Sequence, residues 1–178
     1  MTQPEPPKDD KDWTWTLVQV CPDCGYDPAA VAPEDVAALV TAYTRPWAQV
    51  LVRADVRERP GPLVWSPLEY ACHVRDVCAV FAVRATLMLA QDEPHFPNWD
   101  QDETAITDRY ADQDPAVVAD ELARAAGDWS AVYAACSGPD WERTGIRSNG
   151  SQFTVASLGV YGLHDIRHHL WDVGAIPV

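Results

Sequence analysis

The sequence predicts an all-α protein built as a four-helix bundle. Four segments carry apolar residues at the spacing of an amphipathic helix, and each follows turn or capping residues. One long polar connection separates the second helix from the third, as in bundles with a crossover. With 178 residues, 47% of them hydrophobic, the chain can bury one core but not two. We therefore expect an N-terminal arm over residues 1–30 and the bundle over residues 31–178.

The N-terminal arm changes character along its length. Residues 1–12 are rich in proline and charge, so we expect them to be disordered. Residues 13–20 are aromatic and β-branched, which indicates an extended segment lying across the bundle. The arm then turns at Cys21-Pro22-Asp23-Cys24-Gly25.

The first two helices are predicted by apolar spacing and by their start signals. The first should run from about Pro33 to about Ala54, with a kink caused by Pro46. The second has the clearest start in the sequence. Ser66 is the N-cap, Pro67 is the first helical residue, and Glu69 completes a capping box.

The connection to the third helix is long and polar. Residues 92–114 contain eight acidic residues and two prolines, which is too polar and too interrupted for a core helix. Long loops in compact domains often form functional walls or lids. Asp100, Asp102 and Glu103, with Trp99, could line the mouth of a pocket, but a solvated loop is the favoured interpretation.

The last two helices are separated by a predicted hairpin. The third helix should follow Asp114-Pro115 and end near residues 137–139. Asn149-Gly150 predicts a tight turn, so a small β-hairpin is expected before the last helix. Thr154 caps that helix, which should stop before Gly174.

Histidines concentrate on two of the predicted helices. His164 and His168 stand at positions i and i+4, so both can face one metal ion. His73 lies near the start of an inward-facing helix and is the expected third ligand, because bundle metal sites are built from facing helices. Three imidazoles with an open position suit Zn²⁺, and also Ni²⁺ or Fe²⁺. Asp165 and His169 share the same spacing and are the alternative pair, which would give a two-histidine, one-carboxylate site or orient the ligands.

Four further residues are candidates for chemistry. Cys21 and Cys24 have the spacing of half a zinc knuckle, so the pair is a second metal site, a redox pair, or simply two small residues at a packed turn. Glu69 and Asp76 lie about one helical turn before and after His73. Each is a candidate catalytic base or partner of a liganding imidazole, and otherwise a capping or solvated charge.

Charge and cysteine content exclude several classes of function. Thirteen basic against 27 acidic residues give a formal net charge of -14, which disfavours binding to nucleic acid or to an anionic membrane. No apolar run approaches the roughly 20 residues that span a bilayer. Five cysteines are an odd number in a chain too large to need disulfide bonds, which favours a reducing compartment. We therefore expect a soluble cytoplasmic protein.

Two motifs resemble those of a known family. Trp65-Ser66-Pro67-Leu68-Glu69-Tyr70-Ala71-Cys72-His73 is similar to the second-helix motif of the DinB/YfiT-like superfamily, where a capped helix start precedes a metal-binding histidine. Phe153-Thr154-Val155, followed by His164-Asp165-Ile166-Arg167-His168-His169-Leu170, resembles the last helix of that family with its His-x-x-x-His. The similarity covers about residues 31–178. It implies a four-helix bundle with a three-histidine metal site.

The resemblance also implies a class of activity. The superfamily includes thiol-dependent S-transferases and the mycothiol-dependent maleylpyruvate isomerase. We therefore expect a divalent-metal-dependent enzyme in which zinc or nickel, or else iron, activates a low-molecular-weight thiol such as mycothiol toward a small-molecule substrate. Metal-dependent hydrolysis and a non-catalytic metal- or ligand-binding bundle are the alternatives. Apolar helix faces on such bundles often pair, so a homodimer is also expected.

Overall fold

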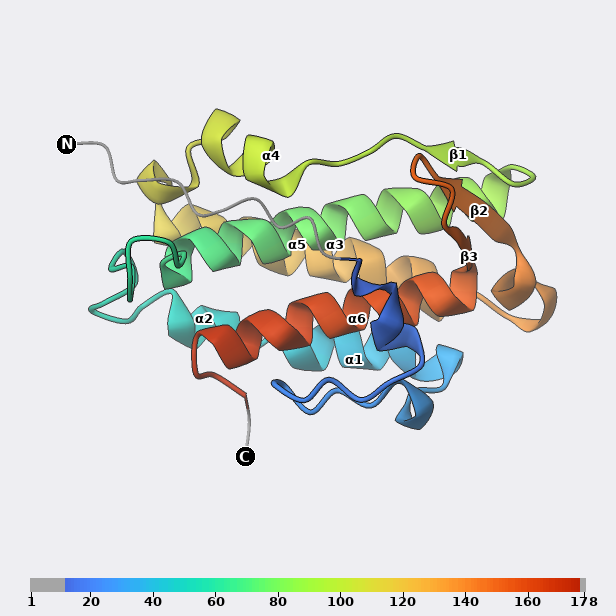
Figure 1. Cartoon of the computed structure of the whole chain (residues 1–178), viewed down its shortest axis with the longest axis horizontal. Helices are drawn as coiled ribbons and strands as arrows, with labels where there is room; N and C mark the ends of the chain where they lie inside the picture. The colour runs from blue at the N-terminus through green and yellow to red at the C-terminus, as the bar shows by residue number, and fades with distance from the viewer. Residues whose placement is uncertain (1–11, 177–178) are drawn as a thin grey trace.

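The computed structural model describes residues 12–176, which form a bundle of four helical segments (Figure 1). The segments are α1, Val36–Thr44, continued by α2, Trp47–Val50; α3, Pro67–Ala90; α5, Pro115–Ala134; and α6, Val155–Asp172. The predicted fold class is therefore confirmed. The boundary at residue 30 between arm and bundle stays a prediction, and the disorder expected for residues 1–11 falls outside the described residues.

Pro46 divides the first helical segment, as its position predicts. α1 ends at Thr44, and Pro46 precedes α2 with a φ of -63°, close to the value that its ring imposes. The segment ends at Val50 rather than at Ala54. There the N–H of Arg53 donates to the carbonyl of Val50, a turn bond that replaces the helical pattern.

The predicted capping box fixes the start of α3. The Glu69 backbone N–H donates to Ser66 Oγ at 3.3 Å, and the Ser66 backbone N–H donates to Glu69 Oε2 at 2.8 Å. Pro67 occupies the first helical turn. Because this end is fixed, His73 lies about two turns into α3 and faces the interior, with 1% of its surface exposed.

The N-terminal arm is not extended over residues 13–20 as predicted. Trp13–Leu17 forms a 3-10 helix, η1, that packs on α6 (Figure 1). Asp12 accepts a hydrogen bond from the Thr14 N–H at 2.9 Å, and the Thr16 hydroxyl donates to the Trp13 carbonyl at 2.8 Å. These local side-chain bonds stabilise a helical turn and outweigh the strand preference of the aromatic residues.

The long connection after α3 contains more regular structure than its polarity predicts. It holds strand β1, His95–Phe96, helix α4, Gln101–Thr107, and the 3-10 helix η4, Tyr110–Asp112. Asp100 starts α4 by accepting hydrogen bonds from the N–H groups of Asp102 and Glu103. Since none of the seven residues that the structure describes in α4 is buried, this helix lies outside the core, as the composition implies.

The predicted hairpin is present and gains a third strand. Strands β2, Thr144–Arg147, and β3, Gln152–Thr154, pair antiparallel with Gly145 opposite Phe153. Strand β1 adds to β2 in parallel, with His95 opposite Ile146. The sheet therefore ties the long connection to the segment before α6, and so places this connection alongside the bundle.

Small residues bring α6 close to its neighbours. A Cβ added to Gly162 would lie 2.6 Å from Phe81 Cδ1 of α3 and 2.8 Å from Trp129 Cη2 of α5. Leu163, Ile166 and Leu170 complete the buried side of α6. In residues 12–176, we find no helix that is both long and apolar enough to cross a membrane.

We expect Gly162→Ala to destabilise the bundle by about 1–3 kcal/mol, because the added methyl group must displace two buried rings. The matched control is Gly127→Ala in α5, where an added Cβ meets no atom within 4 Å among the described residues. That change should stabilise the helix by roughly 0.5–1 kcal/mol. Urea unfolding measures the free energy of unfolding of both variants. Equal values for Gly162→Ala and Gly127→Ala would contradict the close packing of α6.

Candidate metal centres on α6

Helix α6 directs its polar side chains to two different places. Neighbouring residues on an α-helix point about 100° apart, so the pair at 164 and 168 diverges from the pair at 165 and 169. Among the described residues, His73, Asp165 and His169 form one group of ligand atoms, and Cys21, Cys24, His164 and His168 form another. Within each group, all ligand atoms lie within 4.8 Å of one another.

These groups differ from the favoured ligand set. The sequence favoured His73 with His164 and His168, but the structure gathers His73 with the alternative pair, Asp165 and His169. The i, i+4 spacing holds for both pairs, and only the packing of α3 against α6 decides which pair faces His73.

A single carboxylate oxygen lies between two imidazoles in the first group. Asp165 Oδ1 is 3.2 Å from His73 Nε2 and 3.3 Å from His169 Nε2. Two ligand atoms bound to one zinc ion are separated by about 3.3 Å, given bond lengths of about 2.0–2.2 Å. Asp172 Oδ2 lies 2.7 Å from His169 Nδ1 on the far side of the ring. This contact orients the imidazole with Nε2 toward Asp165.

Burial and charge act in opposite directions on these groups. Burial lowers the pKa of His169, but its hydrogen bonds to Asp165 and Asp172 outweigh this effect and raise the pKa to about 9. Burial raises the pKa of Asp165, yet the bonds to His169 and His73 hold it well below its ordinary value. The carboxylate is therefore ionised at neutral pH, as a cation ligand must be.

Aromatic rings enclose His73. Trp99 stacks on its imidazole at 5.5 Å with an interplanar angle of 8°, and Trp65 lies 5.4 Å away. Trp99 is itself held by a hydrogen bond of 2.9 Å to Thr104 of α4. Among the described residues, the buried Nδ1 of His73 has no hydrogen-bond partner. The long connection thus forms one wall of the group through Trp99, whereas the sequence favoured a solvated loop.

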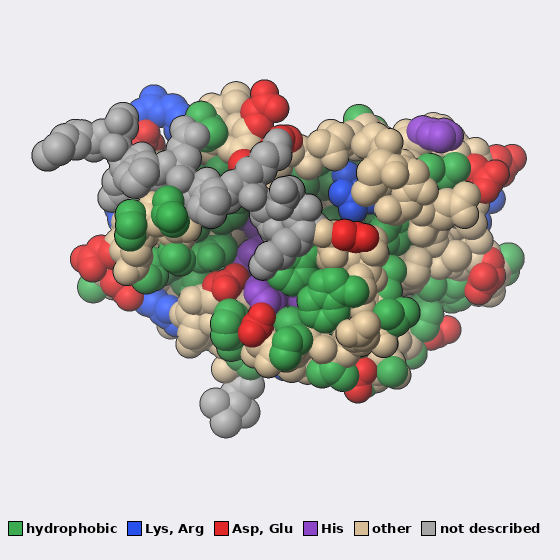
Figure 2. Space-filling model, viewed as in Figure 1, with side chains coloured by type: hydrophobic (Ala, Val, Ile, Leu, Met, Phe, Trp, Pro, Cys, Tyr) green, Lys and Arg blue, Asp and Glu red, His purple; other side chains and the backbone are tan. Residues whose placement is uncertain are grey.

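A cleft of about 320 Å³ reaches the first group. Figure 2 shows imidazole atoms at the surface in the middle of one face, beside acidic side chains. The cleft is lined by Asp12, Trp13, Asn98, Trp99, Asp100, Gln101, Asp102, Arg147, Asn149, Tyr161, His164, Asp165, His168 and His169. A small molecule in this cleft would therefore lie against Asp165 and His169.

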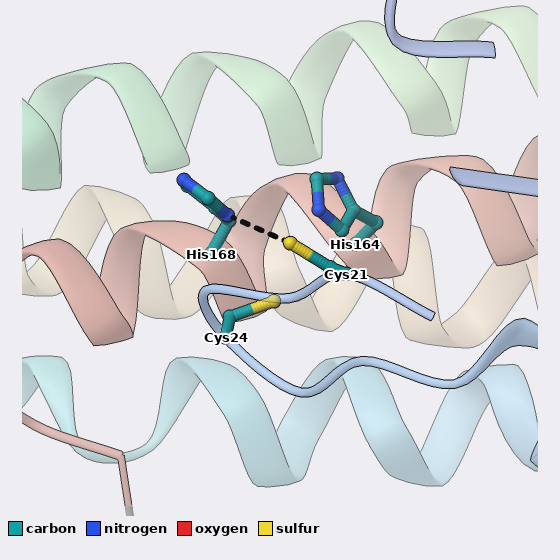
Figure 3. A group of neighbouring side chains, drawn as sticks. All are labelled: Cys21, Cys24, His164 and His168. Atoms are coloured by element: carbon teal, nitrogen blue, oxygen red, sulfur yellow. Dashed lines mark hydrogen bonds between the residues drawn. The ribbon is translucent and has the colours of Figure 1, made fainter. Parts of the chain in front are cut away.

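The second group joins the N-terminal arm to α6. Cys21 Sγ lies 3.6 Å from His168 Nδ1, and Cys24 and His164 complete the group (Figure 3). Burial raises the pKa of the Cys24 thiol to about 11, so without a cation this sulfur is a poor nucleophile at neutral pH.

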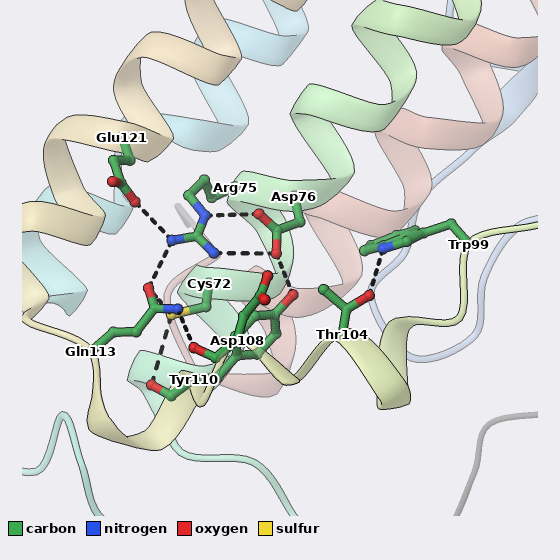
Figure 4. Close-up of polar contacts among 9 residues, drawn as sticks. All are labelled: Cys72, Arg75, Asp76, Trp99, Thr104, Asp108, Tyr110, Gln113 and Glu121. Carbon is green, nitrogen blue, oxygen red and sulfur yellow. Dashed lines mark hydrogen bonds and ion pairs between the residues drawn. The ribbon is translucent and has the colours of Figure 1, made fainter. Parts of the chain in front are cut away.

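The two candidate catalytic acids have structural partners instead. Asp76 Oδ1 accepts a hydrogen bond of 2.8 Å from Arg75 Nε, and its Oδ2 accepts one from the Tyr110 hydroxyl (Figure 4). Arg75 extends this network to Gln113 at 2.7 Å. Glu69 accepts from Ser66 and from Arg59, so both of its oxygens are engaged. Neither acid belongs to the two ligand groups.

Two contributors to the first group were missed in the sequence. Asp172 stands three residues after His169, a spacing that places both on one side of a helix. Its signal was therefore visible in the sequence. The stacking of Trp99 on His73 was not, because it depends on the path of residues 92–114 across α3.

The fold defines a class of protein, a four-helix bundle, and its second and last helices bring together two histidines and a carboxylate that could hold a metal ion. The family model described as the DinB superfamily matches residues 37–173, and the chain belongs to this superfamily. Its closer relation to the thiol-dependent enzymes stays a prediction.

A solved structure has a similar fold. YfiT from Bacillus subtilis matches with a TM-score of 0.63 at 17% sequence identity, over 80% of this chain and 81% of that chain. YfiT is described as a probable metal-dependent hydrolase with an unusual four-helix bundle topology. No curated protein matches the chain. At this identity the likeness to YfiT shows the fold alone.

We expect Glu69 to stabilise the fold in a pH-dependent way. Burial raises its pKa, but the bonds from Arg59 and Ser66 outweigh burial and hold the pKa below its ordinary value of 4.5. The stabilisation of the folded state by ionised Glu69 is therefore fully present above pH 4.5. It is lost as the pH falls through the pKa that Glu69 has in the folded state. Glu69→Gln should cost roughly 1–3 kcal/mol at neutral pH and less in acid.

Unfolding free energies between about pH 7 and pH 3 measure this dependence. The control is Glu58→Gln, at an exposed glutamate in the loop before α3. In this variant the unfolding free energy should change with pH as steeply as in the unmodified chain. A Glu69→Gln variant with that same slope would contradict a stabilising ionised Glu69.

Proposed function

We propose that this chain is a divalent-metal-dependent enzyme that acts on a small molecule in the cleft, with His73, Asp165 and His169 holding the ion. The position of Asp165 Oδ1, 3.2 and 3.3 Å from two imidazole nitrogens, carries this proposal. Two nitrogens and one carboxylate oxygen leave coordination positions open, and they suit zinc, nickel or iron.

The surroundings of the three residues fit a bound cation. His73 is buried between tryptophans with its Nε2 3.2 Å from Asp165 Oδ1, so a cation held here would be shielded from bulk water on the α3 side. Asp172 accepts a hydrogen bond from His169 Nδ1, and a cation at Nε2 would take the place of the proton that Nε2 shares with Asp165. Asp172 thus orients the imidazole of α6, whereas Trp65 and Trp99 pack against that of α3.

The resemblance of the two helix motifs supports a thiol-dependent transferase or isomerase. A divalent cation lowers the pKa of a coordinated thiol and so supplies a thiolate at neutral pH. The chain itself provides the binding site. Arg147 lines the same cleft as Asp165 and offers a positive charge to an anionic group of the substrate or thiol, while Trp99 and Trp13 offer apolar walls.

Metal-dependent hydrolysis is the second candidate, and the description of YfiT supports it. It would use the same three ligands, with water in place of the thiol. The two candidates differ in one requirement: turnover of electrophilic substrates should depend on an added thiol in the first and not in the second. The cytoplasmic location and the homodimer stay predictions.

We expect His73→Ala and Asp165→Asn each to remove one equivalent of bound metal and to abolish turnover. Loss of one of three ligands should weaken binding by at least about 100-fold, more than the loss of an orienting partner. Elemental analysis of the purified chain, together with turnover assays with small thiols and electrophilic acceptors, measures both effects.

The matched control is His95→Ala, which removes an exposed histidine outside both ligand groups. This variant should keep its metal and its turnover. Unchanged metal content in both ligand variants would refute the centre. Metal that binds without any turnover would instead favour a non-catalytic bundle.

Asp172→Asn should leave the ligands in place and weaken metal binding by about 10–100-fold, because it removes the acceptor that orients His169. Competition with a metallochromic chelator measures the affinity, and the unfolding temperature of the metal-free chain is the control. A lower unfolding temperature with unchanged metal affinity would show that Asp172 acts on the fold rather than on the site.

A further inference from the structure

We propose that Cys21, Cys24, His164 and His168 bind a second divalent ion, Zn²⁺, in a closed structural site that fastens the N-terminal arm to α6. The proposal is independent of the catalytic centre, because the two groups share no residue. Two cysteines and two histidines are a common donor set for structural zinc, and four protein ligands leave no position for a substrate.

The spacing of the ligand atoms fits this ion. All four lie within 4.8 Å of one another, and Cys21 Sγ is 3.6 Å from His168 Nδ1. Tetrahedral zinc with bond lengths of about 2.3 Å to sulfur and 2.0–2.1 Å to nitrogen separates these two atoms by about 3.6 Å. This one distance therefore matches an edge of a zinc tetrahedron, and the other pairs of ligand atoms lie within 4.8 Å.

His164 provides an independent indication of a ligand. Its side chain is buried, with 4% of the residue exposed, and its Nε2 has no hydrogen-bond partner among the described residues. Figure 3 shows the ring facing the Cys21 sulfur. A buried imidazole nitrogen without a partner is costly, and coordination to zinc would satisfy it.

Backbone hydrogen bonds close the turn that carries both cysteines. Gly25 adopts a φ of +69°, which favours glycine, and its N–H donates to the Cys21 carbonyl at 2.9 Å. The Cys21 N–H donates to the Tyr26 carbonyl at 2.9 Å, which closes the turn. The Tyr26 hydroxyl then donates to the Val160 carbonyl at 2.7 Å, one turn before His164 on α6.

Aromatic side chains cover the group. Trp13 of η1 lies 5.6 Å from both the His164 and His168 rings, and Tyr26 lies 5.7 Å from His164. Trp13 and Tyr26 shield the group on these sides, while His164 and His168 border the cleft on another.

Zinc binding would cross-link distant parts of the chain. Cys21 and His168 are 147 positions apart in sequence, so the ion joins the arm to the last helix. On binding, each thiol releases its proton to solvent as a sulfur–zinc bond forms, and no electron is transferred. A disulfide between Cys21 and Cys24 would instead need an oxidant and would leave His164 without a partner.

Cobalt substitution of the full-length chain tests the site, because thiolate–cobalt coordination produces a charge-transfer absorption that histidine and carboxylate ligands do not. We expect the metal-free chain to develop this absorption with Co²⁺ alone and to lose it when two equivalents of Zn²⁺, one for each proposed site, are added. Cys21→Ser and His164→Ala should each bind one zinc ion fewer per chain, and Cys21→Ser should lose most of the absorption.

Two controls separate this site from the catalytic centre. Cys136→Ser removes a cysteine outside the group and should keep the full absorption. His73→Ala removes a ligand of the other group and should also keep it, even if no activity is ever found for the protein. The experiment on the unmodified chain needs no variant, so a misfolded variant does not prevent the test.

Three results would overturn the proposal. One is a cobalt-loaded chain without thiolate charge transfer. Another is an absorption that persists in both Cys21→Ser and Cys24→Ser. The third is a Cys21–Cys24 disulfide in protein purified without reductant, with a zinc content that does not change when the disulfide is reduced.

Discussion

The structure depends on one constraint: the polar side chains of α6 that lie in or near the core must each find a partner. Residues 164, 165, 168 and 169 fall within two helical turns, at the interior of the bundle or its edge. Burying such groups is unfavourable unless each finds a hydrogen bond or an ion. Because neighbours diverge by about 100°, no single partner can serve all four. Helix α3 provides His73 for one pair, and the arm provides two cysteines for the other.

The first group forms only because the helices approach closely and in one register. Gly162 lets Phe81 and Trp129 pack directly against the backbone of α6, which brings α3 and α6 together. The capping box at Ser66 fixes where α3 begins and therefore which residues face α6. Local backbone chemistry at a helix end thus positions a ligand two turns later, and the ion itself need not organise the bundle.

Local signals made much of the fold predictable. The starts of α3, α5 and α6 each depend on a capping residue and an apolar period, and each was predicted. The periodicity of apolar residues does not predict strand β1, which depends on pairing with β2, or the helical form of η1, which depends on side-chain hydrogen bonds. The sequence could not decide the register of the candidate ligands for a related reason. The i, i+4 rule applies equally to 164/168 and 165/169, and only the position of the arm shows that both pairs can be used.

The pair 165/169 of α6 faces His73 and the pair 164/168 faces the arm. This assignment changes the reaction for which the proposed catalytic centre is suited. With Asp165 in place of a third neutral imidazole, the donor set carries one negative charge and offsets part of the charge of a divalent ion. Such a set should acidify a bound group less than three imidazoles would. A thiol needs little acidification, since its ordinary pKa is about 8.5, whereas that of water is about 15.7. The carboxylate therefore supports a thiol as the activated group more readily than water, although zinc held by two histidines and a glutamate also activates water in known hydrolases.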